Sequence, residues 1–535
     1  MAARTPLFRM VERSLHAARW SLRTGVPPEE VVGLARERAL TRRDFVRGSA
    51  AAAAALAAGC GPWARRGGGP AGGAGGSDQV VVVGAGIAGL TAAWRLRQAG
   101  VRVRLLEGQD RVGGRMYSLR GFFPDGQVCE LGGELIDTGH TAIRGLADEL
   151  EITLDDLAAD DPALAETWWF GGRSHSDEEV VRAFLPVAEK IQADLATLPD
   201  EITYRGHRGA EALDRMTLAE WIDGATPGGW FRDLLHVAYT TEYGLETDHQ
   251  SALNLLLLID PEPDPFRIFG ESDERFHVHA GNDAITTALA DRLGAAVETG
   301  TRLEAVTELP DGGFRLAVDR GGGAAELRAD HLVLAIPFTL LRQVRLEVDL
   351  PPAKRRAIAE LGYGTNAKLM AGFGERVWRT RHGADGSVFA DLPFQTTWET
   401  SRMQGGASGI LTNFTGGDHG LELVRGTAAE QAALLAADLD RVFPGAAEAH
   451  RGAKAVRFHW PSSPWALGSY ASYLPGQWTA LCGAEGERVR RLHFAGEHTS
   501  LEAQGFMEGG CESGERAARE VLADLGLAAA DPRAA

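Results

Sequence analysis

The sequence predicts an α/β fold that is built in two lobes. Four consecutive valines, Val80–Val83, are typical of a parallel strand that is buried on both faces. A glycine-rich turn, a helical pattern and a second apolar stretch, Val101–Leu106, follow this strand directly. The 535 residues also exceed what one simple core encloses, and this length predicts the second lobe.

Composition limits the classes of function. Hydrophobic residues make up 44% and charged residues 24%, as in ordinary soluble globular proteins. The net charge of −18 argues against a nucleic-acid partner, because such a protein needs a basic face to neutralise phosphates. No histidine or cysteine cluster has the spacing of a zinc site, so we expect no metal. The four cysteines contain no CxxC pair, so we expect no disulfide framework; they are Cys60, Cys129, Cys482 and Cys511.

Residues 1–76 resemble an export leader and a flexible linker. Arg42 and Arg43 precede the short apolar run Ala50–Ala58, and this order is typical of a signal read by the twin-arginine (Tat) export machinery. The run is too short for a stable spanning helix, which needs about 20 apolar residues. The run leads into Cys60 through a segment that resembles a lipoprotein cleavage box. We therefore expect an exported protein, periplasmic or extracellular, with Cys60 as a candidate lipid anchor and ordinary cleavage as the alternative.

The turn Gly84-Ala85-Gly86-Ile87-Ala88-Gly89 has the spacing of a dinucleotide-binding motif. Gly84 and Gly86 allow a tight turn, and Gly89 lets the next helix, which should run to about Gln98, approach the strand. The free amides and the dipole of that helix favour a pyrophosphate. Glu107 ends the second strand, where an acid accepts hydrogen bonds from both ribose hydroxyls. The alternative is a tight turn without a ligand.

The segment after Glu107 favours FAD over NAD. Gly108 follows the acid, and Arg111-Val112-Gly113-Gly114-Arg115 comes a few residues later. Two glycines let backbone amides approach phosphate, and Arg115 is able to form a charge-assisted fork. This extension, so close to the ribose acid, resembles flavoproteins with two dinucleotide-binding domains.

The C-terminal part makes the resemblance specific. His493–Thr499 predicts a short strand and a loop, and Gly505–Gly510 opens a helix. With the N-terminal motif, these segments resemble the flavin amine oxidase family, which includes monoamine, polyamine and L-amino-acid oxidases. The resemblance covers roughly residues 79–525 and implies a Rossmann-like FAD-binding domain with an α+β substrate domain. The implied FAD-binding domain comprises residues 77–142, 271–340 and 465–527, and the substrate domain residues 143–270 and 341–464, with a tail at 528–535.

The motifs and the resemblance together imply a set of cofactor contacts. Glu130–Glu134 resembles the segment beside the flavin ring, Leu303 belongs to a part that closes over the adenine side, and the helix near Phe506 would face the flavin N1–C2 edge. The expected cofactor-binding residues are Gly84, Gly86, Ile87, Ala88, Gly89, Glu107, Gly108, Arg115, Gly132, Gly133, Glu134, Leu303, Glu497, Phe506 and Met507.

Three residues are implied in catalysis: Lys368, Tyr470 and Phe506. Lys368 resembles the family lysine that holds a water beside flavin N5 and assists reoxidation by dioxygen; the alternative is an ordinary surface lysine. Tyr470 and Phe506 would form two walls of an aromatic cage for the amine, and the alternative for Tyr470 is a core aromatic. Ser469 stands where some members attach FAD to a cysteine, so we expect non-covalent FAD.

The implied reaction moves a hydride from the amine-bearing carbon to the flavin. Hydrolysis then gives ammonia and a carbonyl compound, while dioxygen becomes hydrogen peroxide. No Ser-His-Asp or paired-carboxylate arrangement suggests other chemistry.

The substrate is less defined by the sequence. An amino acid needs an arginine for its carboxylate, and Leu135 occupies the position where one group of amino-acid oxidases carries it. Arg144 and an arginine from the substrate domain are the alternatives, and nothing in the sequence selects one of them. Glu130–His140 and the leader nevertheless resemble those of bacterial amino-acid oxidases, and this resemblance slightly favours L-amino acids over monoamines and polyamines.

Two hypotheses outside amine oxidation stay open from the sequence. The first is a flavin-dependent carbon–carbon desaturase, from which Lys368 and Tyr470 would distinguish an amine oxidase. The second is a flavin-bearing sensor without turnover. For the assembly, a homodimer is a candidate.

Overall fold

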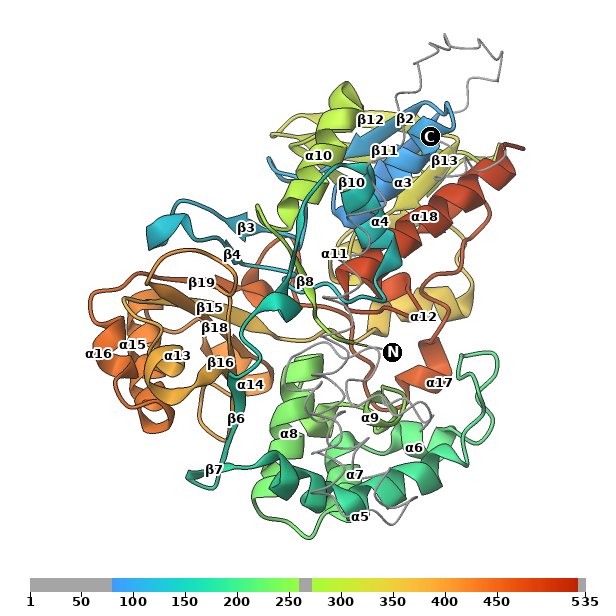
Figure 1. Cartoon of the computed structure of the whole chain (residues 1–535). Coiled ribbons are helices and arrows are strands. Elements are labelled where there is room, and N and C mark those ends of the chain that lie inside the picture. Colours follow the sequence, from blue (N-terminus) through green and yellow to red (C-terminus); the bar gives the residue numbers. More distant parts are fainter. Residues whose placement is uncertain (1–78, 259–271, 528–535) are drawn as a thin grey trace, which may run out of the picture.

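Three sheets organise the chain, for which the computed structural model describes residues 79–258 and 272–527. In Figure 1 the parallel sheet and the four-stranded sheet lie at the top of the molecule. The seven-stranded sheet lies at the left, and a group of helices lies at the bottom. Among the described residues, no helix has the length and apolar character needed to cross a membrane. The expected leader, Cys60 and the tail at 528–535 lie outside the described residues.

The parallel sheet contains the predicted dinucleotide unit. Its strand order is β20-β13-β1-β2-β9, and every neighbouring pair is parallel. The strands are β1 (Val80–Val83), β2 (Val103–Leu106), β9 (Val297–Glu298), β13 (His331–Leu334) and β20 (Leu492–Phe494). The four valines are at most 4% exposed, so the buried parallel strand is confirmed. The second strand begins at Val103 rather than Val101, because the amide of Val101 bonds the carbonyl of Leu96 and closes the preceding helix.

Two helices, α3 (Ile87–Gln98) and α18 (Met507–Asp524), pack tightly beside this sheet (Figure 1). A Cβ at Gly510 would lie 2.6 Å from the Ile87 side chain, and one at Gly514 would overlap the carbonyl oxygen of Ala88. Glycine at these two positions of α18 therefore allows the close approach. Two further helices, α4 (Thr141–Glu149) and α10 (Asp283–Leu293), also contact this pair.

The two other large sheets are mainly antiparallel. Two small antiparallel sheets, β3 (Ser118–Leu119) with β4 (Cys129–Glu130) and β5 (Leu154–Asp156) with β8 (Phe276–Val278), complete the described strands. The four-stranded sheet has the order β12-β11-β10-β14 and contains β10 (Thr301–Glu308), β11 (Phe314–Arg320), β12 (Ala324–Ala329) and β14 (Arg345–Glu347). The seven-stranded sheet has the order β19-β15-β18-β17-β16-β6-β7. Its strands are β6 (Ala165–Phe170), β7 (Arg173–His175), β15 (Ala367–Phe373), β16 (Ala384–Ala390), β17 (Thr396–Glu399), β18 (Gly409–Thr415) and β19 (Ala455–His459). All seven residues of β15 are buried.

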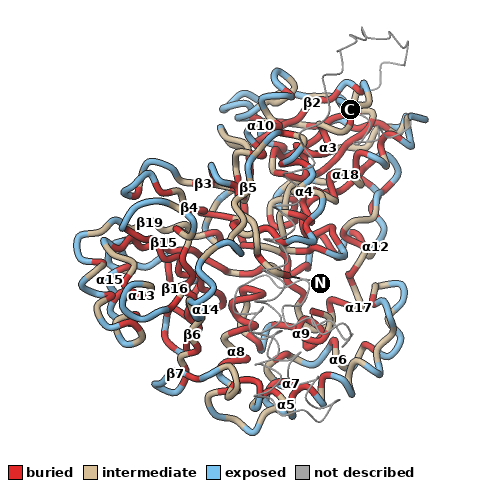
Figure 2. The backbone as a smooth tube through the Cα atoms, in the orientation of Figure 1, coloured by how far each residue is buried: buried red, intermediate tan, exposed pale blue. Residues whose placement is uncertain are grey.

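Five helices of different length fill the remaining corner and pack through apolar inner faces. They are α5 (Asp177–Leu195), α6 (Glu211–Arg215), α7 (Leu218–Ala225), α8 (Trp230–Tyr243) and α9 (Leu253–Leu256). Reciprocal capping bonds between Ser176 and Glu179, and between Thr217 and Glu220, start α5 and α7. Buried and exposed positions alternate along these helices, as an amphipathic pattern requires (Figure 2).

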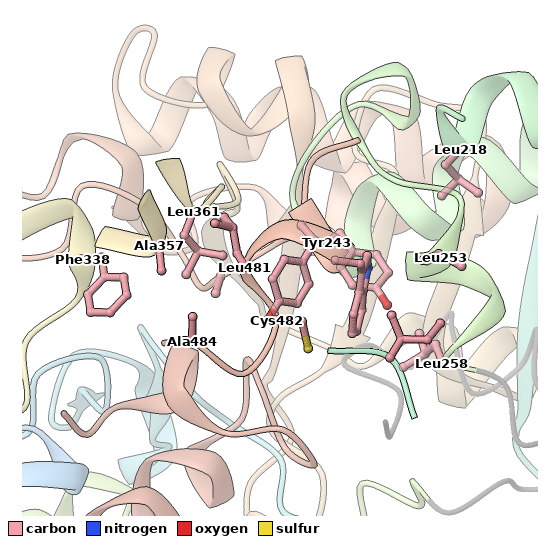
Figure 3. Close-up of a cluster of buried hydrophobic side chains, with 14 of the residues drawn as sticks. Leu218, Tyr243, Leu253, Leu258, Phe338, Ala357, Leu361, Leu481, Cys482 and Ala484 are labelled. Atoms are coloured by element: carbon pink, nitrogen blue, oxygen red, sulfur yellow. The ribbon is translucent and has the colours of Figure 1, made fainter. Parts of the chain in front are cut away.

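One apolar core joins this corner to the parallel sheet. Its side chains come from α8 and α9, from α11 (Phe338–Leu341) and α12 (Pro352–Glu360), and from α17 (Gln477–Leu481). In Figure 3, Tyr243, Leu481 and Cys482 lie between Phe338 on one side and Leu258 on the other. The helical corner and the dinucleotide unit therefore share a hydrophobic core, and the domain boundaries expected from the sequence stay a prediction.

Candidate active site

A cavity of about 580 Å³ lies at the carboxyl ends of the parallel strands. Val83 ends β1, Glu107 follows β2, Ala335 follows β13 and Gly496 follows β20, and all four residues line the cavity. In parallel α/β sheets this edge is where ligands bind. Of the cofactor-binding residues expected from the sequence, every one except Gly89 lines this cavity, and so do Lys368 and Tyr470.

The glycine turn shapes one wall. Gly84 has a φ of +103°, and a Cβ there would lie 2.7 Å from the carbonyl oxygen of Ala335. Gly89 does not line the cavity. A Cβ at this position would overlap the carbonyl oxygen of Gly84, so Gly89 instead allows the helix to pack closely on the strand. A Cβ at Gly86 would meet no described protein atom within 4 Å and would instead point into the cavity space. A glycine that no protein contact requires fits the close approach of a bound pyrophosphate.

Glu107 is held rigidly at the same end. Its Oε2 accepts from the amide of Ala85 at 2.7 Å, and its Oε1 accepts from the amide of Gln109 at 2.9 Å. Burial raises the pKa of this carboxyl group despite the two amide bonds, which lower it. Each oxygen keeps a lone pair for a further donor, and this arrangement suits the hydroxyls of a ribose.

Arg115 lines the cavity, but a carboxylate already holds it. Its Nη1 donates to Glu497 Oε1 at 2.9 Å and to the carbonyl of Ser469 at 2.8 Å. The other oxygen of Glu497, Oε2, accepts from the amide of Gly505 at 2.8 Å. Arg115 therefore joins its own loop to the segments of Ser469 and Glu497 around the cavity. Both bonds use Nη1, so the other guanidinium nitrogens can bind a phosphate. Arg111, by contrast, bonds the carbonyls of its own loop.

The helix α18 points its N-terminus at the cavity. Phe506 is its N-cap residue, and the residues of this turn that line the cavity are Gly505, Phe506, Met507 and Gly510. Because α3 also begins at this cavity, two helix N-termini with their free amides and positive dipole ends meet one space. Such a pair suits a ligand with negative charge at two places, as FAD has in its pyrophosphate and in its reduced flavin.

Lys368 is buried and forms an ion pair with Glu134. Its Nζ lies 2.7 Å from Glu134 Oε2, and it also donates to the carbonyl oxygens of Gly132 at 2.8 Å and Glu130 at 3.3 Å. The alternative of a surface lysine is wrong, since Lys368 is only 4% exposed. Three protein acceptors match its three N–H bonds, so the ammonium also anchors the Glu130–Glu134 segment. The sequence did not predict this anchoring role.

Glu134 is correspondingly well bound. Its other oxygen accepts from Trp398 Nε1 at 2.9 Å and from the Thr400 hydroxyl. Burial would raise the pKa of Glu134, but the ammonium of Lys368 and these hydrogen bonds outweigh burial, so its pKa lies below the ordinary value. The Glu134 carboxylate is therefore charged at neutral pH.

Aromatic rings also line the cavity, and that of Trp398 lies beside this pair. Tyr470 and Phe506 both border the cavity, and their role as walls of an amine cage stays a prediction. The Tyr470 hydroxyl donates to the carbonyl of Glu242 at 2.7 Å. Phe506 packs edge-on against His140 with ring centroids 5.0 Å apart. The cavity is also lined by Trp460 and Trp465, and by Trp398 and Phe414, which the sequence analysis missed. Two of these belong to β17 and β18, and no local pattern could have linked those strands to the site.

The described lining contains two arginines, Arg115 and Arg302. Arg115 pairs with Glu497, and Arg302 pairs with Glu304 at 2.6 Å. Arg144, the candidate partner of a substrate carboxylate, does not line the cavity. It donates to the carbonyl of Thr138 instead, and its guanidinium lies 4.7 Å from the ring of Phe276.

The comparisons with known proteins agree with this geometry. Residues 87–522 match the model of a family described as flavin containing amine oxidoreductase. An L-amino acid dehydrogenase of Synechocystis sp. is 26% identical over 83% of this chain and 94% of that protein. The flavin-containing amine oxidase B of Sus scrofa is 27% identical over 84% of this chain and 86% of that protein. The solved structure of a cyclohexylamine oxidase from Brevibacterium oxydans shares the fold, with a TM-score of 0.73 at 21% identity over 84% of this chain and 99% of that one.

The family implies FAD, and the residues described above fit it: a glycine cradle, a ribose-binding acid, two helix N-termini and a cavity that joins them. When bound, FAD supplies the electron acceptor for amine oxidation. This chain belongs to the flavin-containing amine oxidoreductase family and is an FAD-dependent amine oxidase by family.

Proposed function

We propose that this enzyme converts a primary amine, water and dioxygen into a carbonyl compound, ammonia and hydrogen peroxide. The observation that carries the proposal is one cavity that is lined by the dinucleotide cradle at Gly84–Gly86, by Lys368 and by several aromatic side chains. The aromatic side chains bind the body of the amine and exclude water from it. The amine reacts in its neutral form, because an ammonium has no lone pair to support the developing iminium.

Two classes of substrate differ in their need for a cationic partner. The slight preference for L-amino acids came from the sequence, and the relative from Synechocystis sp. is named an L-amino acid dehydrogenase. In the described lining, however, both arginines are already paired with carboxylates, and Leu135 contributes an apolar side chain. An unpaired substrate carboxylate in such a cavity is costly. We therefore place amines without a carboxylate first and L-amino acids second.

The hypothesis of a carbon–carbon desaturase has less support. It predicted a cavity without the flavin-side lysine and without the aromatic cage. Lys368 and Tyr470 lie in one cavity here, and this combination favours an amine substrate.

The deciding experiment uses the purified full chain with FAD bound. Peroxide and ammonia release are measured across matched pairs, such as phenethylamine with L-phenylalanine and cadaverine with L-lysine. We expect faster turnover of the member without the carboxylate. Faster turnover of the amino acids would reverse the order of the two classes. Absence of flavin bleaching by every compound under anaerobic conditions would refute amine oxidation itself.

Export, lipidation at Cys60 and dimer formation are further proposals from the sequence. Fractionation of cells that express the full chain should place the protein outside the cytoplasm, and replacement of Arg42 and Arg43 by lysines should retain it inside. A Cys60→Ala variant distinguishes a lipid anchor from plain cleavage, because only a lipidated protein would lose its membrane association. The mass of the purified protein in solution tests the dimer.

A further inference from the structure

His331, His493 and Asp524 meet at a place that the proposed reaction does not use. His331 begins β13, His493 is the middle residue of β20, and Asp524 is the last residue of α18. The N-terminus of α18 lines the FAD cavity, and its 18 residues span about 27 Å. The cluster therefore lies at the end of α18 that is remote from the cavity.

The ligand atoms of these residues are spaced like those of a metal site. Asp524 Oδ2 lies 3.4 Å from His493 Nε2 and 3.8 Å from His331 Nδ1. One possible ligand atom from each of the three residues lies within 4.8 Å of the other two. Zinc binds nitrogen and oxygen at about 2.0–2.2 Å, so two of its tetrahedral ligands lie roughly 3.4 Å apart. A single ion fits between these atoms with small side-chain adjustments.

The surroundings orient His493 as a metal ligand. Its Nδ1 lies 2.9 Å from Glu520 Oε2, and the other oxygen of Glu520 accepts from Arg516 at 2.8 Å. A proton on Nδ1 that is shared with Glu520 leaves the lone pair on Nε2, which faces Asp524. Histidines that bind metals commonly donate their second ring nitrogen to a carboxylate in this way.

Without an ion, His493 Nε2 lacks a good hydrogen bond within the described part of the chain. His493 is fully buried, and among the described residues its Nε2 has no hydrogen-bond partner. The separation of 3.4 Å from the carboxylate oxygen exceeds an ordinary charge-assisted hydrogen bond of about 2.7–2.9 Å. Burial of such atoms is unfavourable unless a further group satisfies them.

We propose that His331, His493 and Asp524 bind one Zn²⁺ ion. The side chain of Asp524 is 19% exposed, so the ion has a path from solvent, and a water completes its coordination. Asp524 keeps its other oxygen on Arg488 Nη1, at 2.5 Å. Because the three ligands come from β13, β20 and α18, the ion fastens the last helix to the parallel sheet and has no part in amine oxidation.

The test measures zinc on the FAD-loaded full chain after treatment with a chelator. Equilibrium dialysis against zinc sulfate with elemental analysis should give one zinc per chain, and zinc should raise the melting temperature. Asp524→Asn should weaken zinc binding by about tenfold or more, and Glu520→Gln by about 10–100-fold. Arg488→Gln is the matched control, because it removes the ion pair of Asp524 without removing a zinc ligand. This variant should still bind zinc.

Two results would overturn the site. The first is the absence of stoichiometric zinc in the native chain. The second is an Asp524→Asn variant with unchanged zinc affinity, which would place the ion elsewhere. FAD content and amine oxidation should stay the same in all variants, so failure of this proposal and failure of the proposed function are separately visible.

Discussion

The Nζ of Lys368 lies 2.7 Å from Glu134 Oε2, and both side chains are almost completely buried. Removing one partner of such a pair leaves an uncompensated charge in a medium of low dielectric. For Glu134→Gln we expect a loss of about 3–5 kcal/mol in the free energy of unfolding. Urea denaturation measures it, and the double variant with Lys368→Met should recover part of the loss. Equal losses in the single and double variants would contradict a direct coupling.

The same pair predicts a pH dependence of stability. The pKa of Glu134 is lower in the folded chain than in the unfolded chain, where it is about 4.3. The contribution of Glu134 to the free energy of unfolding is therefore complete at neutral pH. It is lost only as the pH falls below about 4 toward the pKa of Glu134 in the folded chain. The stability difference between the native chain and Glu134→Gln should be constant from pH 6 to pH 8, roughly, and should shrink in acid. A difference that shrinks already near neutral pH would contradict the lowered pKa.

Replacement of Lys368 alone should slow the reaction with dioxygen. The lysine is the cation that lines the cavity beside Gly132 and Glu134, and positive charge favours formation of reduced oxygen species. In Lys368→Met we expect stopped-flow reoxidation of the reduced flavin to be slower by about tenfold or more. The anaerobic half-reaction with amine serves as the control, because it should change less. An unchanged reoxidation rate would remove Lys368 from this role.

Two glycines of one turn should respond differently to alanine. A Cβ at Gly86 meets no described protein atom, so Gly86→Ala should fold and lose FAD. A Cβ at Gly89 overlaps the Gly84 carbonyl, so Gly89→Ala should lower the melting temperature of the apoprotein as well. FAD content after gel filtration and thermal melting of the apoprotein separate the two effects. Full FAD content in Gly86→Ala would contradict the pyrophosphate cradle.

FAD should leave the denatured protein. Ser469 occupies the position of the attaching cysteine, and its hydroxyl donates to Asn366 Oδ1 at 2.7 Å. Acid precipitation should therefore release the yellow colour into solution. A coloured pellet would reveal a covalent bond at another residue.

The dinucleotide unit was predictable because its chemistry is local. Four valines, a glycine turn and Glu107 follow one another in the chain, and a phosphate cradle needs only that order. The partner of Lys368 was not predictable from spacing, because Lys368 lies on β15 of the seven-stranded sheet and Glu134 lies in the distant Glu130–Glu134 segment. Trp398, which donates to Glu134, comes from β17 of the same sheet. The His331, His493 and Asp524 cluster escaped for the same reason, since zinc-site spacing describes neighbours in sequence and these residues are neighbours only in the fold.

The tight packing of α18 on α3 has a consequence for how the enzyme is made. A ribosome completes α3 long before it reaches Gly510 and Gly514, yet the cofactor cavity needs the beginnings of both helices. A nascent chain therefore exposes the glycine turn as an open half-site throughout most of translation. FAD cannot contact the start of α18 until α18 has packed on α3, so we expect FAD capture to follow the docking of α18.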